Sequence, residues 1–212
     1  MQKINIQLKI SENFRLAIED FDLCENLNFI IGPNGSGKSS LLKELSKKLG
    51  SDKSIYMPAE FEVNPNLYVW ELLQIFDQES LPNHFDLQDI PQKAKLSSLS
   101  SGGKQRLLLG LCLDHPNYSH LLLDEPTNFL DPKYKIQLLE RIKKSSKCIL
   151  IASHDLHWFV NDSQCNTFLI NGGKIGSRGK LQDVLESTDM KSFFGMDFKV
   201  EKSPDGKVWL KY

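Results

Sequence analysis

Residues 32–39 read GPNGSGKS and lie between an apolar run at 27–31 and a leucine-bearing stretch at 41–49. This order predicts a strand, a phosphate-binding loop and a helix. Glycines let successive backbone N–H groups turn toward an anion, Lys38 can reach the outer phosphates of a nucleotide, and the Ser39 hydroxyl can ligate Mg²⁺. The positive end of the helix dipole adds to this attraction. The alternative, a plain surface glycine turn, is disfavoured by the strand and helix on either side.

Composition limits the class of protein. The chain has 212 residues, enough for one α/β domain with a small subdomain. Lysine plus arginine (26) nearly balances aspartate plus glutamate (27), so nothing indicates a nucleic-acid or anionic-membrane surface. The four cysteines have no metal-ligand spacing, and no apolar run is long enough to span a membrane. We therefore expect a cytoplasmic protein with reduced thiols, without nucleic-acid binding and without direct membrane insertion.

The N-terminal third carries further strand and helix patterns. Apolar residues alternate with polar ones at 4–10 and more loosely at 16–23, which predicts two antiparallel strands beside the nucleotide. Phe14 lies between them and offers a ring for adenine stacking, with an ordinary core or turn role as the alternative. The helix after the loop is expected to end at Gly50, and residues 55–57 form a short buried strand. From 59 to about 99 the periodicity weakens, which predicts a separate, mostly helical lobe.

Two adjacent acids follow the apolar run at 121–123. Side chains alternate along a strand, so Asp124 and Glu125 point in different directions. One can hold Mg²⁺ and the other can orient and deprotonate a water, although two acids in a solvated turn are the alternative. The next buried strand, 148–152, ends at Ser153 and His154. The loop at 32–39, the acids at 124–125 and the pair at 153–154 thus all follow strands at their carboxyl ends, where open α/β sheets bind ligands. The other histidines are expected at the surface or as satisfied core groups.

Weaker signals complete the chain. The segment SSLSSGGKQR at 97–106 opens a helix with a second anion-ready N-terminus, and Asp131-Pro132 begins another helix with an N-cap aspartate. We expect a hairpin at 167–175, a short helix near 181–185 and a last hairpin around 203–206.

Read together, these motifs resemble the nucleotide-binding subunit of ABC transporters over nearly the whole chain. GPNGSGKS matches the Walker A loop, and LLLDEP at 121–126 matches Walker B with its catalytic glutamate. LSSGG at 99–103 matches the ABC signature, with Ser101 and Gly103 departing from the usual residues. By the same resemblance Asp131 is the D-loop aspartate and His154 the switch histidine. Two such subunits meet head to tail, with the signature helix of one capping the γ-phosphate held by the other.

The resemblance implies an α/β fold of the P-loop NTPase type. We expect a RecA-like parallel core sheet with an N-terminal antiparallel β part, together with a small inserted helical subdomain. In a single domain of residues 1–212, the core with its antiparallel part takes 1–58 and 114–170. The helical subdomain with the signature takes 59–113, and C-terminal hairpins and short helices take 171–212.

The resemblance also implies an ATPase that converts ATP and water to ADP and phosphate. Catalytic roles fall on Glu125, His154 and Lys38, and Mg²⁺ is held by Ser39 and Asp124. The residues expected to bind ATP are Gly32, Pro33, Asn34, Gly35, Ser36, Gly37, Lys38, Ser39, Ser40, Asp124, Ser100, Gly102 and Asp131. Of these, Ser100 and Gly102 act on the nucleotide of a second copy. Integral membrane permease subunits are the other partners, and they place the protein peripherally on the inner face of the plasma membrane.

Two departures from the family pattern stand out. Ala59 occupies the position of the Q-loop glutamine, so we expect slow or loosely coupled turnover, with Glu60 or a water as a partial substitute. The helical lobe lacks a helix before Phe85, which affects the surface that receives a permease.

The chain's ending resembles ATPases that import iron chelates, haem or cobalamin, whereas its signature wording is also found in exporters. A soluble ABC protein is the alternative from another class, and a module that binds ATP without hydrolysis is a weaker one. A guanine-reading Asn-Lys-x-Asp motif is absent from the sequence, which disfavours a GTPase.

Overall fold

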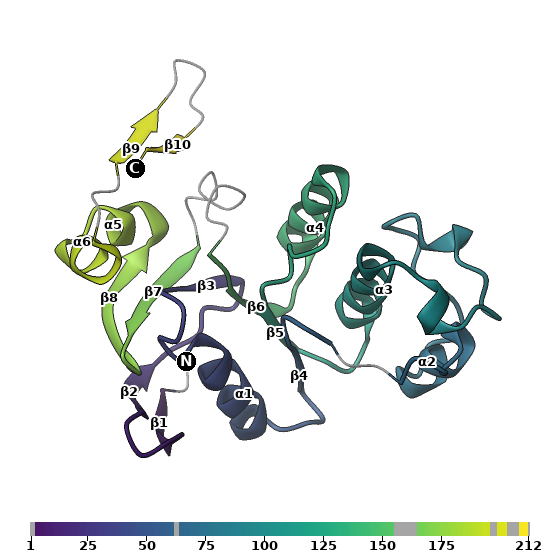
Figure 1. Ribbon diagram of the computed structural model, residues 1–212, viewed down its shortest axis with the longest axis horizontal. Coiled ribbons are helices and arrows are strands. Elements are labelled where there is room, and N and C mark those ends of the chain that lie inside the picture. Colours follow the sequence, from purple (N-terminus) through teal and green to yellow (C-terminus); the bar gives the residue numbers. More distant parts are fainter. Residues whose placement is uncertain (1–2, 62–63, 155–164, 196–198, 203–207, 212) are drawn as a thin grey trace.

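A computed structural model describes the chain except for residues 1–2, 62–63, 155–164, 196–198, 203–207 and 212. Its centre is a six-stranded sheet with the order β4-β5-β6-β3-β7-β8, in which only β8 runs antiparallel to its neighbour (Figure 1). The strands of this sheet are β3 (Leu27–Ile31), β4 (Ser54–Met57), β5 (His120–Asp124), β6 (Cys148–Ala152), β7 (Asn166–Asn171) and β8 (Lys174–Lys180).

The inner strands are apolar on both faces, as expected for parallel strands covered on both sides. Alternate residues point to opposite faces, so neighbours such as Phe29 and Ile30 belong to different cores. One core contains Ile30, Leu122 and Leu150 of the sheet, packed with α1 (Lys38–Leu49) and the N-terminal strands. The other joins the opposite face of the sheet to the remaining helices. Each fully buried leucine, isoleucine or phenylalanine contributes about 1.5–3 kcal/mol to folding.

The N-terminal strands β1 (Ile4–Lys9) and β2 (Arg15–Phe21) pair antiparallel in a separate two-stranded sheet, as predicted. The ring of Phe21 packs against that of Phe168 on β7, with centroids 4.4 Å apart. The helix α1 ends at Gly50, whose φ of 93° explains the glycine there. This part of the chain thus covers the face of the sheet on which α1 lies.

The segment between β4 and β5 contains the helices α2 (Val69–Ile75) and α3 (Ser101–Asp114) and the 3-10 turns Leu87–Asp89 and Leu96–Ser98. Figure 1 places α2 and α3 at the end of the molecule opposite β7 and β8. No helix lies between Phe76 and Asp86, a stretch that the structure describes completely. The expected fold class, a P-loop NTPase core with a small inserted helical part, is confirmed, while the exact domain boundaries stay a prediction.

The remaining elements are α4 (Pro132–Lys144) after β5, then α5 (Leu181–Leu185), α6 (Thr188–Phe194), β9 (Lys199–Lys202) and β10 (Val208–Lys211). The β7–β8 hairpin turns at Gly172 and Gly173, both with positive φ. The expected short helix is α5, whereas α6 was not predicted. β9 and β10 pair antiparallel as expected, although the turn at 203–207 lies outside the described residues. No helix among the described residues is long and apolar enough to cross a membrane.

Candidate nucleotide site

Three adjacent parallel strands, β5, β6 and β3, bring their carboxyl ends to one edge of the sheet. Asp124 pairs with Ala152, and Ala152 pairs with Ile30, so the ends of the strands are level. The loop at 32–37 follows β3, Glu125 follows β5, and Ser153 and His154 follow β6. Parallel pairing therefore gathers the residues that the sequence singled out.

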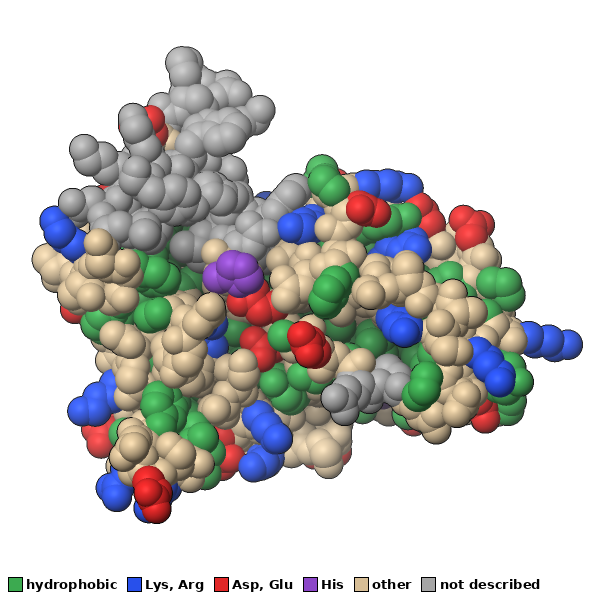
Figure 2. All heavy atoms as spheres, in the orientation of Figure 1, with side chains coloured by type: hydrophobic (Ala, Val, Ile, Leu, Met, Phe, Trp, Pro, Cys, Tyr) green, Lys and Arg blue, Asp and Glu red, His purple; other side chains and the backbone are tan. Residues whose placement is uncertain are grey.

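A cavity of about 410 Å³ lies at this edge. Its lining residues are Ile10, Phe14, Asn34, Gly35, Ser36, Gly37, Lys38, Ser39, Ser40, Ala59, Asp124 and Glu125. The phosphate loop and both adjacent acids thus share one cavity. On the face drawn in Figure 2, histidine and acidic side chains lie beside each other near the middle of the molecule.

The Lys38 ammonium is buried and held by the loop itself. Its Nζ donates to the carbonyl oxygens of Gly32, at 2.8 Å, and Pro33, at 3.0 Å. Burial lowers the pKa of Lys38, while the nearby charges of Glu125 and Asp124 oppose that shift. An incoming phosphate would replace these carbonyls by a charged acceptor, which makes a stronger hydrogen bond.

Glycines fix the path of the loop. Gly35 and Gly37 adopt φ of 75° and 106°, a region that favours glycine. A Cβ on Gly37 would lie 3.1 Å from Cζ of Phe14, so the aromatic ring covers the start of α1. Phe14 therefore lines the cavity from the β1–β2 connection, where an adenine ring could reach it.

The hairpin tip between β7 and β8 supports the loop from outside the cavity. The N–H of Gly173 donates to the carbonyl of Ser36 at 3.0 Å, and the carbonyl of Gly173 accepts from Ala17 on β2 at 2.8 Å. The hydroxyl of Ser36 is buried without a hydrogen-bond partner within the described chain. Such an unpaired polar atom in an anion-binding loop is suited to a phosphate oxygen.

Asp124 is buried at the end of β5 and hydrogen-bonded on two sides. Its carboxylate accepts from Ser39 and, at 3.3 Å, from the hydroxyl of Tyr56 on β4. Burial raises the pKa of Asp124, and the hydrogen bond from Ser39 lowers it. Burial and the charge of Asp124 also raise the pKa of Tyr56 to about 12. A hydroxyl and a carboxylate that meet in this way offer two of the oxygen ligands that Mg²⁺ prefers.

Glu125 points away from Asp124, toward the end of β6. Its carboxylate accepts from the hydroxyl of Ser153 at 3.0 Å, the backbone N–H of His154 at 3.1 Å and, at 2.8 Å, contacts Nδ1 of His154. Its backbone φ is 47°, which costs a non-glycine residue about 1–3 kcal/mol and is typical of functional sites. Glu125 is thus aimed by its neighbours, whereas the His154 side chain stays exposed.

The signature residues lie outside this cavity. Ser100 is exposed and caps α3, because its hydroxyl accepts from the N–H of Gly103 at 3.1 Å. A Cβ on Gly102 would lie 2.6 Å from the carbonyl oxygen of Phe129, so the helix start packs against the segment before α4. Asp131 occupies the N-cap position of α4, as predicted, but its exposed side chain makes no capping hydrogen bond.

Comparisons with known proteins show the family of this chain. A protein-family model with the description "ABC transporter" matches residues 24–128. A zinc import ATP-binding protein from Histophilus somni is 35% identical, with 80% of this chain and 71% of that protein covered. The chain belongs to the family of ABC transporter ATP-binding proteins. It is therefore an ATP-binding protein and an ATPase.

Two further matches extend over most of this ABC ATPase. The petrobactin import ATP-binding protein of Bacillus anthracis is 24% identical, with 84% of this chain and 86% of that protein covered. A solved ATP-binding subunit of an ABC transporter has a TM-score of 0.67 at 21% identity, covering 84% of this chain and 87% of its own. The structural match shows that the fold is shared.

The position of the missing glutamine is visible in this ABC ATPase. Ala59 lines the cavity beside the two acids, so only a methyl group faces the place where a Q-loop amide is expected. Glu60 is exposed and is not among the residues that line the cavity. The expectation that Glu60 or a water partly substitutes for the glutamine stays a prediction.

Sequence reasoning missed three groups at the site of this ABC ATPase, namely Tyr56, Gly173 and the role of Ser153. Tyr56 is part of an apolar strand, and only strand pairing reveals that it faces Asp124. The Asn-Gly-Gly turn indicated a hairpin, and nothing in the sequence shows that the tip touches the phosphate loop. Asp155, the residue after His154, lies outside the described residues.

Proposed function

We propose that this ABC ATPase powers the import of a metal ion or metal chelate through a membrane permease. The observation that carries the proposal is the 35% identity to a zinc import ATP-binding protein over most of both chains. The relative named for petrobactin import supports the same direction of transport. An iron chelate, haem or a cobalamin-like compound was the expectation from the sequence, and zinc joins these candidates.

ATP occupies the cavity at the carboxyl ends of the strands. The N–H groups of the loop from Gly32 to Ser40 hold the β- and γ-phosphates, together with Lys38 and the buried hydroxyl of Ser36. Phe14 offers a ring to the adenine. The support for this orientation is that Phe14, the loop and the two acids line one cavity.

Ser39 and Asp124 are the proposed ligands of Mg²⁺. The fit rests on the hydrogen bond that joins their side chains, which places two hard oxygen atoms together at the loop. A bound Mg²⁺ supplies positive charge that neutralises the β- and γ-phosphate oxygens. Tyr56 then positions Asp124 from the side of β4.

Glu125 polarises the attacking water, accepts its proton and directs its oxygen to the γ-phosphorus. The bond from the γ-phosphorus to the bridging oxygen breaks, ADP leaves with that oxygen, and the proton passes from Glu125 to phosphate or solvent. Before that, Glu125 exchanges its contact with Nδ1 of His154 for the water, while its hydrogen bond from Ser153 can remain. His154 is released by this exchange and contacts the γ-phosphate. Most of the rate acceleration comes from positioning and charge stabilisation.

A second copy of the chain completes the site. Ser100 and Gly102 lie outside the cavity of their own subunit, so in a head-to-tail dimer they serve the nucleotide of the partner subunit. Asp131 lies at the same interface. Permease subunits contact the helical part at 59–113 and hold the protein on the cytoplasmic face of the membrane.

Uptake measurements test the proposal. In a strain without the gene, uptake of radioactive zinc or of a ferric siderophore falls, and the wild-type gene restores it whereas Glu125→Gln does not. If neither uptake changes, the import proposal is wrong. Increased accumulation of the cargo in the deleted strain indicates export instead. Unchanged uptake together with a defect in a soluble cellular process indicates a non-transport role.

A further inference from the structure

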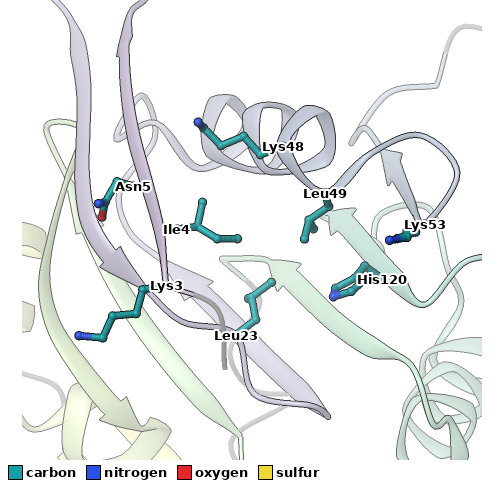
Figure 3. A pocket seen from close by; sticks show the side chains of 8 residues that line it. All are labelled: Lys3, Ile4, Asn5, Leu23, Lys48, Leu49, Lys53 and His120. Carbon is teal, nitrogen blue, oxygen red and sulfur yellow. The ribbon is translucent and has the colours of Figure 1, made fainter.

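A second cavity, of about 530 Å³, lies at the C-terminal end of α1. Figure 3 shows its lining side chains, which come from β1 and the residue before it, the segment after β2, the end of α1, the turn before β4 and the start of β5. The lining residues are Lys3, Ile4, Asn5, Leu23, Lys48, Leu49, Lys53 and His120. Lys38, in the nucleotide site, lies ten residues before Lys48 on the same helix, which corresponds to roughly 15 Å. The two cavities are therefore separate.

The charged side chains that line this second cavity are all basic, and one of them, Lys3, pairs with Asp20 at 3.4 Å. Three lysines and one histidine line it, and none of its eight lining residues is acidic. Within the described chain, the ammonium groups of Lys48 and Lys53 have no hydrogen-bond or ion-pair partner. Lys47, the neighbour of Lys48, instead pairs with Glu44 at 3.2 Å. Two unpaired ammonium groups at one concave site create a positive potential that attracts anions.

His120 is partly buried beside one of these lysines, Lys53. Burial, and then the charge of Lys53, lower the pKa of the His120 ring. Its Nδ1 contacts the hydroxyl of Ser119 at 2.9 Å, which leaves Nε2 as the ring nitrogen available to a ligand. An anion bound beside Lys53 would favour the protonated ring and so gain a further positive partner.

The other walls of the cavity are apolar. Ile4, Leu23 and Leu49 pack partly buried against the core that contains α1. Asn5 uses its Oδ1 to accept from the N–H of Asp20 at 2.8 Å, so its NH₂ group remains as a neutral donor. The size lies within the range of small-molecule sites, about 300–1,000 Å³, and a few polar groups among apolar walls are typical of them.

We propose that this cavity binds a small organic polyanion. Two or more phosphate or carboxylate groups contact Lys48, Lys53 and His120, and the body of the molecule lies against Ile4 and Leu49. Phosphates and carboxylates both carry anionic oxygens that accept hydrogen bonds, and lysine ammonium groups can bind either. The ligand is separate from ATP and from the transported cargo.

Calorimetric titration tests the proposal with two probes, inorganic pyrophosphate and citrate. The protein is saturated with ADP without added magnesium, because ADP fills the phosphate loop and both probes chelate the metal. We expect at least one probe to bind with a dissociation constant below about 1 mM. The probe that binds more tightly identifies phosphate or carboxylate as the preferred group.

Variants at neighbouring lysines provide the matched comparison. Lys48→Gln combined with Lys53→Gln should weaken binding at least about tenfold, while Lys47→Gln, on the same helix but outside the cavity, should change it less than about twofold. The single variant Lys53→Gln serves if the double variant does not fold. Equal losses in Lys47→Gln and in the cavity variants would mean unspecific attraction and overturn the proposal.

The imidazole of His120 gives an independent readout. In NMR titrations the better-binding probe should raise the pKa of His120 in the wild type and leave it unchanged in the double variant. No saturable binding of either probe up to about 10 mM, or an unchanged His120 pKa at saturation, would overturn the proposal.

Discussion

The hydroxyl of Tyr56 donates a hydrogen bond to Oδ2 of Asp124 over 3.3 Å. The two residues come from adjacent strands, β4 and β5, whose pairing sets Tyr56 beside Leu122 and Met57 beside Leu123. Asp124 also accepts from Ser39, so the carboxylate is fixed by β4 on one side and by α1 on the other. The proposed magnesium ligand is therefore held in place by two hydroxyl groups of the protein.

Tyr56→Phe should weaken the use of magnesium by this ATPase. The ring remains and packs as before, while Asp124 loses one donor and gains rotational freedom. We expect a loss of stability of about 1 kcal/mol and a several-fold rise in the magnesium concentration that half-saturates ATP hydrolysis. Titrations of the steady-state rate with magnesium measure this. An unchanged magnesium dependence would show that Tyr56 has only a packing role.

Glu125→Gln should keep ATP binding and abolish turnover, with a fall in kcat of about 10²-fold or more. Glutamine has nearly the same shape, so contacts with Ser153 and the backbone of His154 can persist, but it accepts no proton. ATP should then stabilise a dimer, visible by size-exclusion chromatography and light scattering. A variant that still hydrolyses ATP near the wild-type rate would contradict the assignment of Glu125 as the base.

Ala59→Gln should raise the ATPase rate, alone or with the permease. Ala59 lines the nucleotide cavity, so a longer amide there can reach the side on which Asp124 and Glu125 lie. Glu60→Gln is a suitable control, because Glu60 is exposed and outside that lining. Equal rates for Ala59→Gln and wild type, measured both without and with the permease, would show that the missing glutamine does not limit turnover.

The core of the fold was predictable because its strands are continuous apolar runs that end in polar residues. The runs at 27–31, 121–123 and 148–152 each became a strand of the central sheet. Gly50 and the Gly172-Gly173 pair were predictable as well, since positive φ favours glycine. By contrast, α6 was missed because seven residues with few apolar positions give a weak helical pattern, although Ser187 caps the helix.

The site was predictable only in its parts that are contiguous in sequence. The loop at 32–39, Asp124 and Glu125 form compact motifs, and strand order brings them together. The contact of His154 with Glu125 depends on the left-handed backbone of Glu125, which the sequence does not reveal. Tyr56 and Gly173 reach the site through strand pairing and a hairpin tip, interactions between residues far apart in the chain.

The stability of the protein should fall as the pH drops below about 6.5, partly because of His84. Its ring is largely buried beside Phe85, and burial lowers its pKa, with the Asp114 charge opposing and Arg141 reinforcing that shift. The unfolded chain therefore binds a proton more readily, so stability is full above the unfolded pKa and is lost below it. Urea unfolding at pH 7.5 and 5.5 measures how much the free energy of unfolding falls between these two pH values. His84→Phe should make this fall smaller, and an unchanged fall would exclude His84 as a cause.

Gly173→Ala should destabilise the protein and weaken nucleotide binding, whereas Gly172→Ala should do much less. Both glycines have positive φ, 77° and 54°, so each alanine meets a backbone cost of about 1–2 kcal/mol. At Gly172 the new Cβ has no atom within 4 Å, but at Gly173 it would lie 2.1 Å from the carbonyl oxygen of Arg15. The hairpin tip must then move away from β2 and release its hydrogen bond to the Ser36 carbonyl.

The difference between the two alanine variants separates the steric effect from the cost of the turn itself. We expect Gly173→Ala to lose at least about 2 kcal/mol more in urea unfolding than Gly172→Ala. Its ATP affinity should fall several-fold, because the phosphate loop loses its outer support, while Gly172→Ala binds ATP like the wild type. Equal ATP affinities in the two variants, measured at a temperature where both are folded, would show that the hairpin tip stabilises the fold without positioning the phosphate loop.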